Sequence, residues 1–196
     1  MKNKLIKTLA ILSLVTASNI VFAEKSFNYN YIDVGYTHSD VKMATSNLNY
    51  NGYVVKGVKE VADNIHILGE YMNIERSTNT INLDFKTFGM GVHQPLSVDT
   101  DLVVDVYKTN WNNIASTADG DFNSGEVKLR HNFSDDLELS VNYEKHNTTI
   151  GYDGFSIGAI QRVNNNFLIR LDYASLNRSD SAVDWDMTTL SFRHYY

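Results

Sequence analysis

The sequence has no cysteine and a single proline among its 196 residues. Without cysteine, disulfides cannot stabilise the fold. After residue 23 no apolar stretch approaches the ~20 residues that a transmembrane helix needs. No segment there has a convincing helical period either. If the protein enters a membrane, it therefore does so as β-strands.

Basic residues are also scarce, because 17 lysines and arginines stand against 23 aspartates and glutamates. Three of the lysines lie in residues 1–23, so residues 24–196 carry 14 basic and 23 acidic side chains, a formal charge of −9. No basic patch offsets this charge, which excludes nucleic acid as a partner.

Recognisable catalytic and cofactor motifs are missing as well. The chain has no Gly-x-Ser-x-Gly, His-Glu-x-x-His, P-loop or dinucleotide-binding fingerprint. Its six histidines stand apart in sequence, and none has a second histidine at ligand spacing. We therefore predict no enzymatic activity, no cofactor and no metal.

Residues 1–23 have the pattern of a secretory signal peptide. Three lysines form a positive start, an apolar stretch follows, and Val21-Phe22-Ala23 is a small-residue cleavage site. The prediction is Sec-type export with cleavage near Ala23, which leaves residues 24–196 as one domain.

In the rest of the chain, apolar and polar residues alternate in many short stretches. In the stretch DLELSVNYEK, Asp136 to Lys145, apolar and polar residues alternate, so one face of an extended strand is apolar and the other polar. Ten such stretches, separated by turn residues, are predicted as strands: Tyr29–His38, Asn51–Glu60, Ile65–Ile74, Phe85–His93, Asp101–Asn110, Phe122–Asn132, Asp136–His146, Tyr152–Val163, Phe167–Leu176 and Asp186–Tyr195.

The connections between these strands alternate in length. Those after even-numbered strands are short, and those after odd-numbered strands are usually longer and polar. Short periplasmic turns and longer extracellular loops are typical of a transmembrane antiparallel up-and-down β-barrel. The predicted fold is therefore an all-β barrel of ten strands with both termini on the periplasmic side, and eight strands is the alternative count. Pro95 is expected in a turn, where its missing N–H breaks no ladder.

Sorting the strand residues by parity separates an apolar face from a charged face. The apolar face is almost free of charge, as lipid contact requires, because Arg or Lys there costs ~2–4 kcal/mol at mid-bilayer. Either the charges of the other face pair and fill the lumen, or Gly89, Gly91 and Gly158 leave a narrow wet path. The predicted lumen charges are Asp33, Lys56, Glu70, Asp105, Glu126, Lys128, Arg130, Glu138, Arg162, Arg170, Asp172 and Arg193.

The separation of apolar and charged residues onto alternate faces also fits a soluble barrel with a charged exterior. Other features therefore decide between a membrane barrel and a soluble one. Aromatic residues gather near strand ends, as in the girdles of membrane barrels, and Tyr29, Tyr31, Tyr36 and Tyr53 are among those expected there. A lipocalin-like barrel would add a helix, and none is predicted. The apolar face is therefore expected to contact outer-membrane lipid.

Two stretches, Tyr29–Val41 (YNYIDVGYTHSDV) and Phe88–Lys108 (FGMGVHQPLSVDTDLVVDVYK), resemble strands of small OmpX-like outer-membrane barrels of Gram-negative bacteria. The final MTTLSFRHYY resembles the C-terminal signature of outer-membrane proteins, with Tyr196 and His194 where that signature usually has Phe and an apolar residue. The resemblance implies a porin-like barrel without catalytic residues, placed in the outer membrane by the barrel-assembly machinery through its C-terminal strand.

Two short motifs have a chemical alternative. HNFSDD, His131 to Asp136, contains groups that barrel-embedded hydrolases use, but Ser134 and the aspartates fit turn chemistry better. Asp119 and Asp121 lie in TADGDFNSGE, which we expect to be a solvated extracellular loop rather than a Ca²⁺ site.

These patterns predict an outer-membrane β-barrel with a structural, surface-interaction or porin-like role and an extracellular ligand of unknown identity. Three alternatives stay open: a narrow small-solute channel, a barrel-embedded hydrolase, and a soluble periplasmic lipocalin-like binder.

Overall fold

The computed structural model describes residues 27–43, 45–78, 81–114, 118–147, 152–178 and 183–196. The predicted signal peptide and its cleavage site near Ala23 lie outside these residues. No helix in the described part of the chain is long and apolar enough to cross a membrane.

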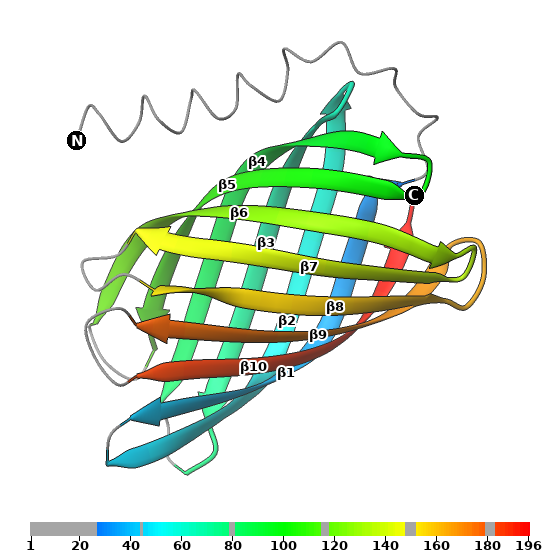
Figure 1. Ribbon diagram of the computed structural model, residues 1–196. Coiled ribbons are helices and arrows are strands. Elements are labelled where there is room, and N and C mark those ends of the chain that lie inside the picture. Colours follow the sequence, from blue (N-terminus) through cyan, green and yellow to red (C-terminus); the bar gives the residue numbers. More distant parts are fainter. Residues whose placement is uncertain (1–26, 44, 79–80, 115–117, 148–151, 179–182) are drawn as a thin grey trace, which may run out of the picture.

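The described residues form ten strands that close into one antiparallel barrel (Figure 1). They are β1 (Tyr31–Met43), β2 (Ser46–Ala62), β3 (Ile65–Arg76), β4 (Asn82–Ser97), β5 (Thr100–Asn113), β6 (Asp119–Ser134), β7 (Leu137–Asn147), β8 (Tyr152–Arg162), β9 (Phe167–Arg178) and β10 (Asp184–Tyr195). Each strand pairs with its neighbours in sequence, and β1 closes the ring by pairing with β10. The predicted all-β up-and-down barrel is confirmed, with ten strands rather than eight.

Closure gives every strand two hydrogen-bonded neighbours, so the sheet has no open edge. Two-residue turns join β2 to β3, β4 to β5 and β6 to β7, and four residues join β8 to β9. Beside each two-residue turn the register shifts, at Glu60/Ala62, Pro95/Ser97 and Asn132/Ser134, because a bulge bends the strand into the turn. We call this end of the barrel, which also holds the C terminus (Figure 1), the turn end, and the opposite end the loop end.

At the loop end the strands run further than predicted. β1 reaches Met43 and β2 begins at Ser46, so most of a stretch expected to be a loop is a β-ladder. Asp119 and Asp121, also expected in a loop, belong to β6 and pair with β5. The outward face of the β1–β2 extension is polar, whereas Val41, Leu48 and Tyr50 lie on its inward face, so the apolar residues are on the opposite face from the exposed belt. Pro95 was wrongly expected in a turn, because it lies within β4 beside a bulge.

The apolar face of the strands points outward. In DLELSVNYEK, Leu139 and Val141 are 37% and 46% exposed, whereas Glu138 and Asn142 are 8% and 9% exposed. The same exposed belt continues around the barrel through Ile32, Val34, Met90, Val127, Ile157, Leu171 and Leu190. An apolar exterior around a charged interior is the arrangement of a transmembrane barrel and the reverse of a soluble one.

Candidate functional site

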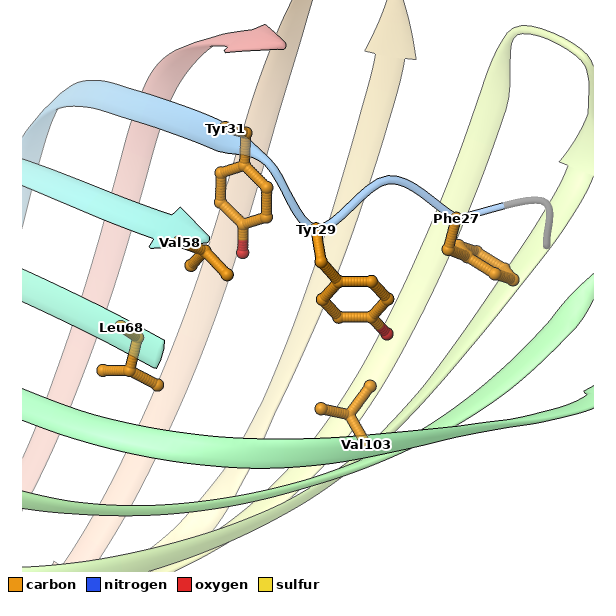
Figure 2. Close-up of a cluster of buried hydrophobic side chains, with 6 residues drawn as sticks. All are labelled: Phe27, Tyr29, Tyr31, Val58, Leu68 and Val103. Carbon is orange, nitrogen blue, oxygen red and sulfur yellow. The ribbon is translucent and has the colours of Figure 1, made fainter. Parts of the chain in front are cut away.

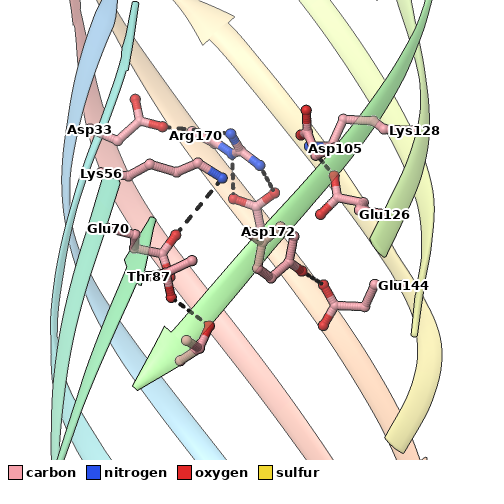
Figure 3. A network of polar contacts seen from close by, with 12 residues as sticks. Asp33, Lys56, Glu70, Thr87, Asp105, Glu126, Lys128, Glu144, Arg170 and Asp172 are labelled. Carbon is pink, nitrogen blue, oxygen red and sulfur yellow. Dashed lines mark hydrogen bonds and ion pairs between the residues drawn. The ribbon is translucent and has the colours of Figure 1, made fainter. Parts of the chain in front are cut away.

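The inward-facing side chains fill the barrel in three layers along its axis. The central layer is charged, and Figure 3 shows it. The turn-end layer is built around Tyr29 and the loop-end layer around two tryptophans. These layers decide whether the lumen can conduct, so each is described in turn.

Ion pairs across β1, β9 and β10 hold one side of the central layer. Arg193 of β10 donates from Nε and Nη2 to the two carboxylate oxygens of Asp33 on β1, at 2.7 and 2.8 Å. Arg170 donates to both oxygens of Asp172 at 2.5 and 2.7 Å and lies 3.5 Å from Asp33. Arg193 is only 1% exposed, so its charge depends on the carboxylate it meets.

Two lysines add further ion pairs to the central layer, Lys56 beside Asp33 and Arg170, and Lys128 apart from them (Figure 3). Lys56 Nζ lies 3.8 Å from Glu70 on the neighbouring strand, and Lys128 forms a close ion pair with Glu126 on its own strand. Glu144 accepts a hydrogen bond from the Tyr107 hydroxyl at 2.8 Å. Positive and negative side chains therefore pair with one another along the inner wall, within a strand or between neighbouring strands.

Glycines admit these charged groups rather than water. A Cβ atom on Gly91 would lie 1.8 Å from Oδ1 of Asp105, which is itself 2.8 Å from Nε2 of His66. A Cβ on Gly158 would lie 2.6 Å from Asp172 Oδ1. Carboxylates occupy the space beside Gly91 and Gly158, and Tyr107 occupies that beside Gly89, which favours paired charges over a wet path along the glycines.

The turn-end layer is built around Phe27 and Tyr29, which precede β1, and Tyr31, its first residue. Figure 2 shows Phe27, Tyr29 and Tyr31 projecting in a row into the barrel. The ring of Tyr29 stacks on His93 at 3.8 Å, and its hydroxyl donates to Asp101 at 2.6 Å. Tyr29 and Tyr31 are 3% and 7% exposed, so their predicted place in an aromatic girdle is wrong.

Arg130 joins the turn-end layer to the barrel wall. Its guanidinium makes two hydrogen bonds to Glu138, at 2.7 and 2.9 Å. The same group lies 4.6 Å from the centre of the Phe27 ring and 4.9 Å from that of Tyr29, within cation–π range. The segment before β1 is thus held by stacking, charge and a hydrogen bond together.

The loop-end layer is apolar. Tyr50, Ile74 and Phe85 are buried inside the barrel, and half-buried Trp111 and Trp185 pack against them. The Trp185 indole N–H donates to the Ser39 hydroxyl across the β1–β10 seam. This layer covers the charged centre from the side of the longer loops.

The cavity between the turn-end and central layers is small. The cavity bordered by the turn-end and central layers has a volume of about 20 Å³. Since one water needs roughly 10–15 Å³ of such space, it has room for about one water. A larger cavity of about 440 Å³ lies at the turn end, beside the β6–β7 and β8–β9 turns.

Eleven of the twelve predicted lumen charges point inward and have an oppositely charged or histidine partner. Arg162 is the exception, because it lies exposed at the end of β8, where its Nε donates to the backbone carbonyl of Asp135 at 3.0 Å. Within the described residues, no group of three or more His, Asp or Glu side chains is placed to hold a metal ion.

The His131–Asp136 motif forms turn contacts. The Ser134 hydroxyl accepts hydrogen bonds from the backbone N–H groups of Asp136 and Leu137, at 3.3 and 3.2 Å. His131 shares a hydrogen bond of 2.9 Å with the Thr100 hydroxyl instead. This is the turn chemistry expected for Ser134.

Sequence reasoning missed the turn-end layer. Tyr29 and Tyr31 have the same parity as Asp33, and His66 has the same parity as Glu70, so each could have been assigned to the lumen. The aromatic character of the tyrosines suggested the girdle instead. Parity was the more reliable signal, because it follows from strand geometry.

Comparison with known proteins gives no sequence family, since no family model and no curated protein matches the chain. Among solved structures, the translocator domain of the autotransporter NalP from Neisseria meningitidis is 8% identical, with a TM-score of 0.50 over 100% of this chain and 98% of that one. Ail, the attachment invasion locus protein of Yersinia pestis, is 15% identical (86% and 100% covered, TM-score 0.45). The neisserial surface protein NspA is 10% identical (86% and 98% covered, TM-score 0.44).

The likeness to the NalP translocator domain agrees with the closed antiparallel ring and the apolar belt. The protein has the fold of an outer-membrane β-barrel. The recognition of a small outer-membrane barrel, which the OmpX-like resemblance implied, is confirmed at the level of the fold.

Proposed function

We propose that this outer-membrane barrel has a closed lumen and acts through its two ends, in a structural or surface-interaction role. The turn end faces the periplasm and the loop end faces the outside, in the manner of short periplasmic turns and extracellular loops. In this proposal residues 1–23 direct export and are removed near Ala23, and the barrel-assembly machinery recognises β10.

The filling of the lumen carries the proposal. The charges of the central layer are paired, and the cavity that borders them has a volume of about 20 Å³. Barrels of about eight strands are just filled by side chains, whereas those of ~16–18 strands hold an aqueous channel. Ten strands with long paired charges belong near the filled limit.

The loop end supports a role at the surface. In three hairpins, a tyrosine at the loop-end edge of the apolar belt donates a hydrogen bond to a carboxylate nearer the loop end. The pairs are Tyr71 to Asp84 at 2.8 Å, Tyr143 to Asp153 at 2.9 Å and Tyr173 to Asp186 at 3.1 Å. Tyrosine favours such a boundary because its ring is apolar and its hydroxyl polar. Beyond this boundary, toward the loop end, the strands continue with a polar outer surface, which we call the polar collar. Its residues include Asn47, Asn49, Asn110, Asn112, Asp119 and Asp121.

The first test asks whether the protein is a closed membrane barrel. The barrel is extracted from outer membranes with detergent, and its mobility on a gel is compared with and without boiling. A mobility shift on boiling is expected, because a closed barrel resists detergent when cold. Recovery of the protein by osmotic shock without detergent would instead support the soluble binder.

The same preparation is then added to planar bilayers, with a general porin as the positive control. We expect no discrete conductance steps from the wild-type protein. Reproducible single-channel openings would contradict the closed lumen and favour the narrow small-solute channel.

A further inference from the structure

The larger cavity at the turn end has the properties of a ligand pocket, which neither barrel closure nor lipid contact explains. Its volume of about 440 Å³ falls within the range of roughly 300–1,000 Å³ that is usual for ligand sites. It lies outside the sealed centre, so a ligand could enter it without opening the lumen.

The pocket has an apolar floor and aromatic walls. Ile160 and Leu168 are 3% and 4% exposed and line its deep part. Phe27 and the two C-terminal tyrosines line it as well, and the Tyr196 hydroxyl donates to the backbone carbonyl of Val58 at 3.3 Å. Phe27 is only 7% exposed, so Tyr195 and Tyr196 supply the aromatic surface, which suits the apolar face of a sugar ring.

Side-chain amides stand along the rim. Asn164 Oδ1 accepts hydrogen bonds from the backbone N–H groups of Asn166 and Phe167, at 3.0 and 3.1 Å, and so fixes the β8–β9 turn. This turn displays Asn165 and Asn166, which are exposed and line the pocket. Each amide can both donate and accept, as recognition of hydroxyl and N-acetyl groups requires.

Charges of both signs complete the rim. The Arg162 side chain is bound to the β6–β7 turn through a hydrogen bond from Nε, and its guanidinium carries four further N–H donors. Asp135 and Asp136 are exposed in that turn and line the same cavity. A ligand with both a carboxylate and an amine would find partners for each.

We propose that this pocket binds an amino-sugar glycan that bears a charged peptide, the chemistry of the bacterial cell wall. The aromatic walls stack on the sugar, the amides bind its hydroxyl and N-acetyl groups, and Arg162 with the two aspartates binds the peptide. The assignment rests on the proposed orientation, because the cell wall lies on the periplasmic side of the outer membrane.

Binding is tested with the folded mature protein in detergent micelles and the disaccharide–tetrapeptide that a muramidase releases from peptidoglycan. Calorimetric titration is expected to show saturable binding, with the separate disaccharide and tetrapeptide each binding more weakly. Arg162→Gln should weaken binding by about tenfold through loss of charge-assisted hydrogen bonds, and Asn166→Ala by a few-fold. Lys108→Gln, an exposed change at the loop end, is the matched control and should bind as wild type.

Absence of saturable binding to the wild type, or wild-type affinity in Arg162→Gln, would overturn the pocket assignment. The mobility shift on boiling verifies that each variant is folded. Neither result bears on the closed lumen, which conductance measures separately.

Orientation has its own test, because the chain has no cysteine. Asn165→Cys introduces a single thiol beside the pocket. A membrane-impermeant maleimide should label it only after the outer membrane is permeabilised. Labelling in intact cells would reverse the proposed orientation and remove the cell wall as the ligand, even if the isolated protein binds the probe.

Discussion

The lipid-facing wall and the lumen are built from alternate residues of the same ten strands, yet they follow different rules. On the wall, side chains such as Phe88 and Phe155 are 67% and 63% exposed and need only be apolar. In the lumen, side chains such as Arg193 and Asp105 are 1% and 5% exposed and each meets a particular partner. The wall is therefore specified by composition, and the lumen by complementarity.

Loss of a lumen charge should have the largest effect. Arg193→Leu leaves Asp33 buried without its bidentate partner and should lower the free energy of unfolding by about 3–5 kcal/mol. Urea titration of the detergent-solubilised barrel, followed by tryptophan fluorescence, measures this. Lys42→Met is the control, because Lys42 pairs with Asp186 across the same β1–β10 seam but is exposed. Little change is expected there, and equal losses in the two variants would refute the contrast between buried and exposed pairs.

A charge on the wall should have the next largest effect. Val141 lies in the exposed belt, and Val141→Arg is expected to cost about 2–4 kcal/mol if it lies near the bilayer midplane. Asn49→Arg places the same side chain in the polar collar and should change the unfolding free energy little. The comparison is made in lipid vesicles, where the belt contacts a bilayer. A tolerated Val141→Arg would show that the belt does not face lipid.

The turn-end layer should be sensitive to a single oxygen atom. Tyr29→Phe keeps the ring on His93 but removes the donor to Asp101, which is 1% exposed. Hydrogen bonds to charged groups contribute about 1.5–3 kcal/mol, so a loss of that size is expected in the urea titration. Planar bilayers should still show no openings, because the central layer is intact. An unchanged unfolding free energy would mean that the Tyr29 hydroxyl does not stabilise this layer.

The smallest effect is expected from adding one methyl group, which should lower the thermal stability in the lumen but not on the wall. Gly91→Ala forces a Cβ into Asp105 and His66, and overpacking of this kind costs about 1–3 kcal/mol. Gly57→Ala is the matched change on the wall, where nothing lies within 4 Å of the added atom. Heat-modifiability gels over a temperature series should show a lower transition for Gly91→Ala alone. If both variants melt alike, the glycine in the lumen is not required for the His66–Asp105 contact.

The broad architecture could be predicted because it depends on local pattern. Strict alternation in stretches such as Leu137–Tyr143 showed the strands and their two faces, and the turn residues between stretches gave the number of strands. The strand extensions, including β1 up to Met43, were not recognised, since their outward face is polar and their few apolar residues, such as Val41 and Leu48, lie on the inward face instead of the lipid face. Their pairing becomes evident only when the neighbouring strand is in place.

The candidate site was only partly predictable for a related reason. Parity identified which charges could face inward, but partners such as Asp33 and Arg193 are 160 residues apart and meet only because β1 closes on β10. Arg162 has inward parity and still lies outside the sealed lumen, because it stands at the end of its strand. Position along the axis depends on the register between strands.

The sequence by itself determined an all-β barrel and favoured ten membrane-spanning strands over eight, because a period of two residues and the need to hide backbone hydrogen bonds from lipid leave few other solutions. Only the tertiary structure decided which lumen charges pair with each other, that Tyr29 enters the lumen from a segment outside the barrel wall, and that a pocket remains at the turn end. The physical reason is that alternation fixes the direction of each side chain, whereas ring closure and strand register fix which side chains meet.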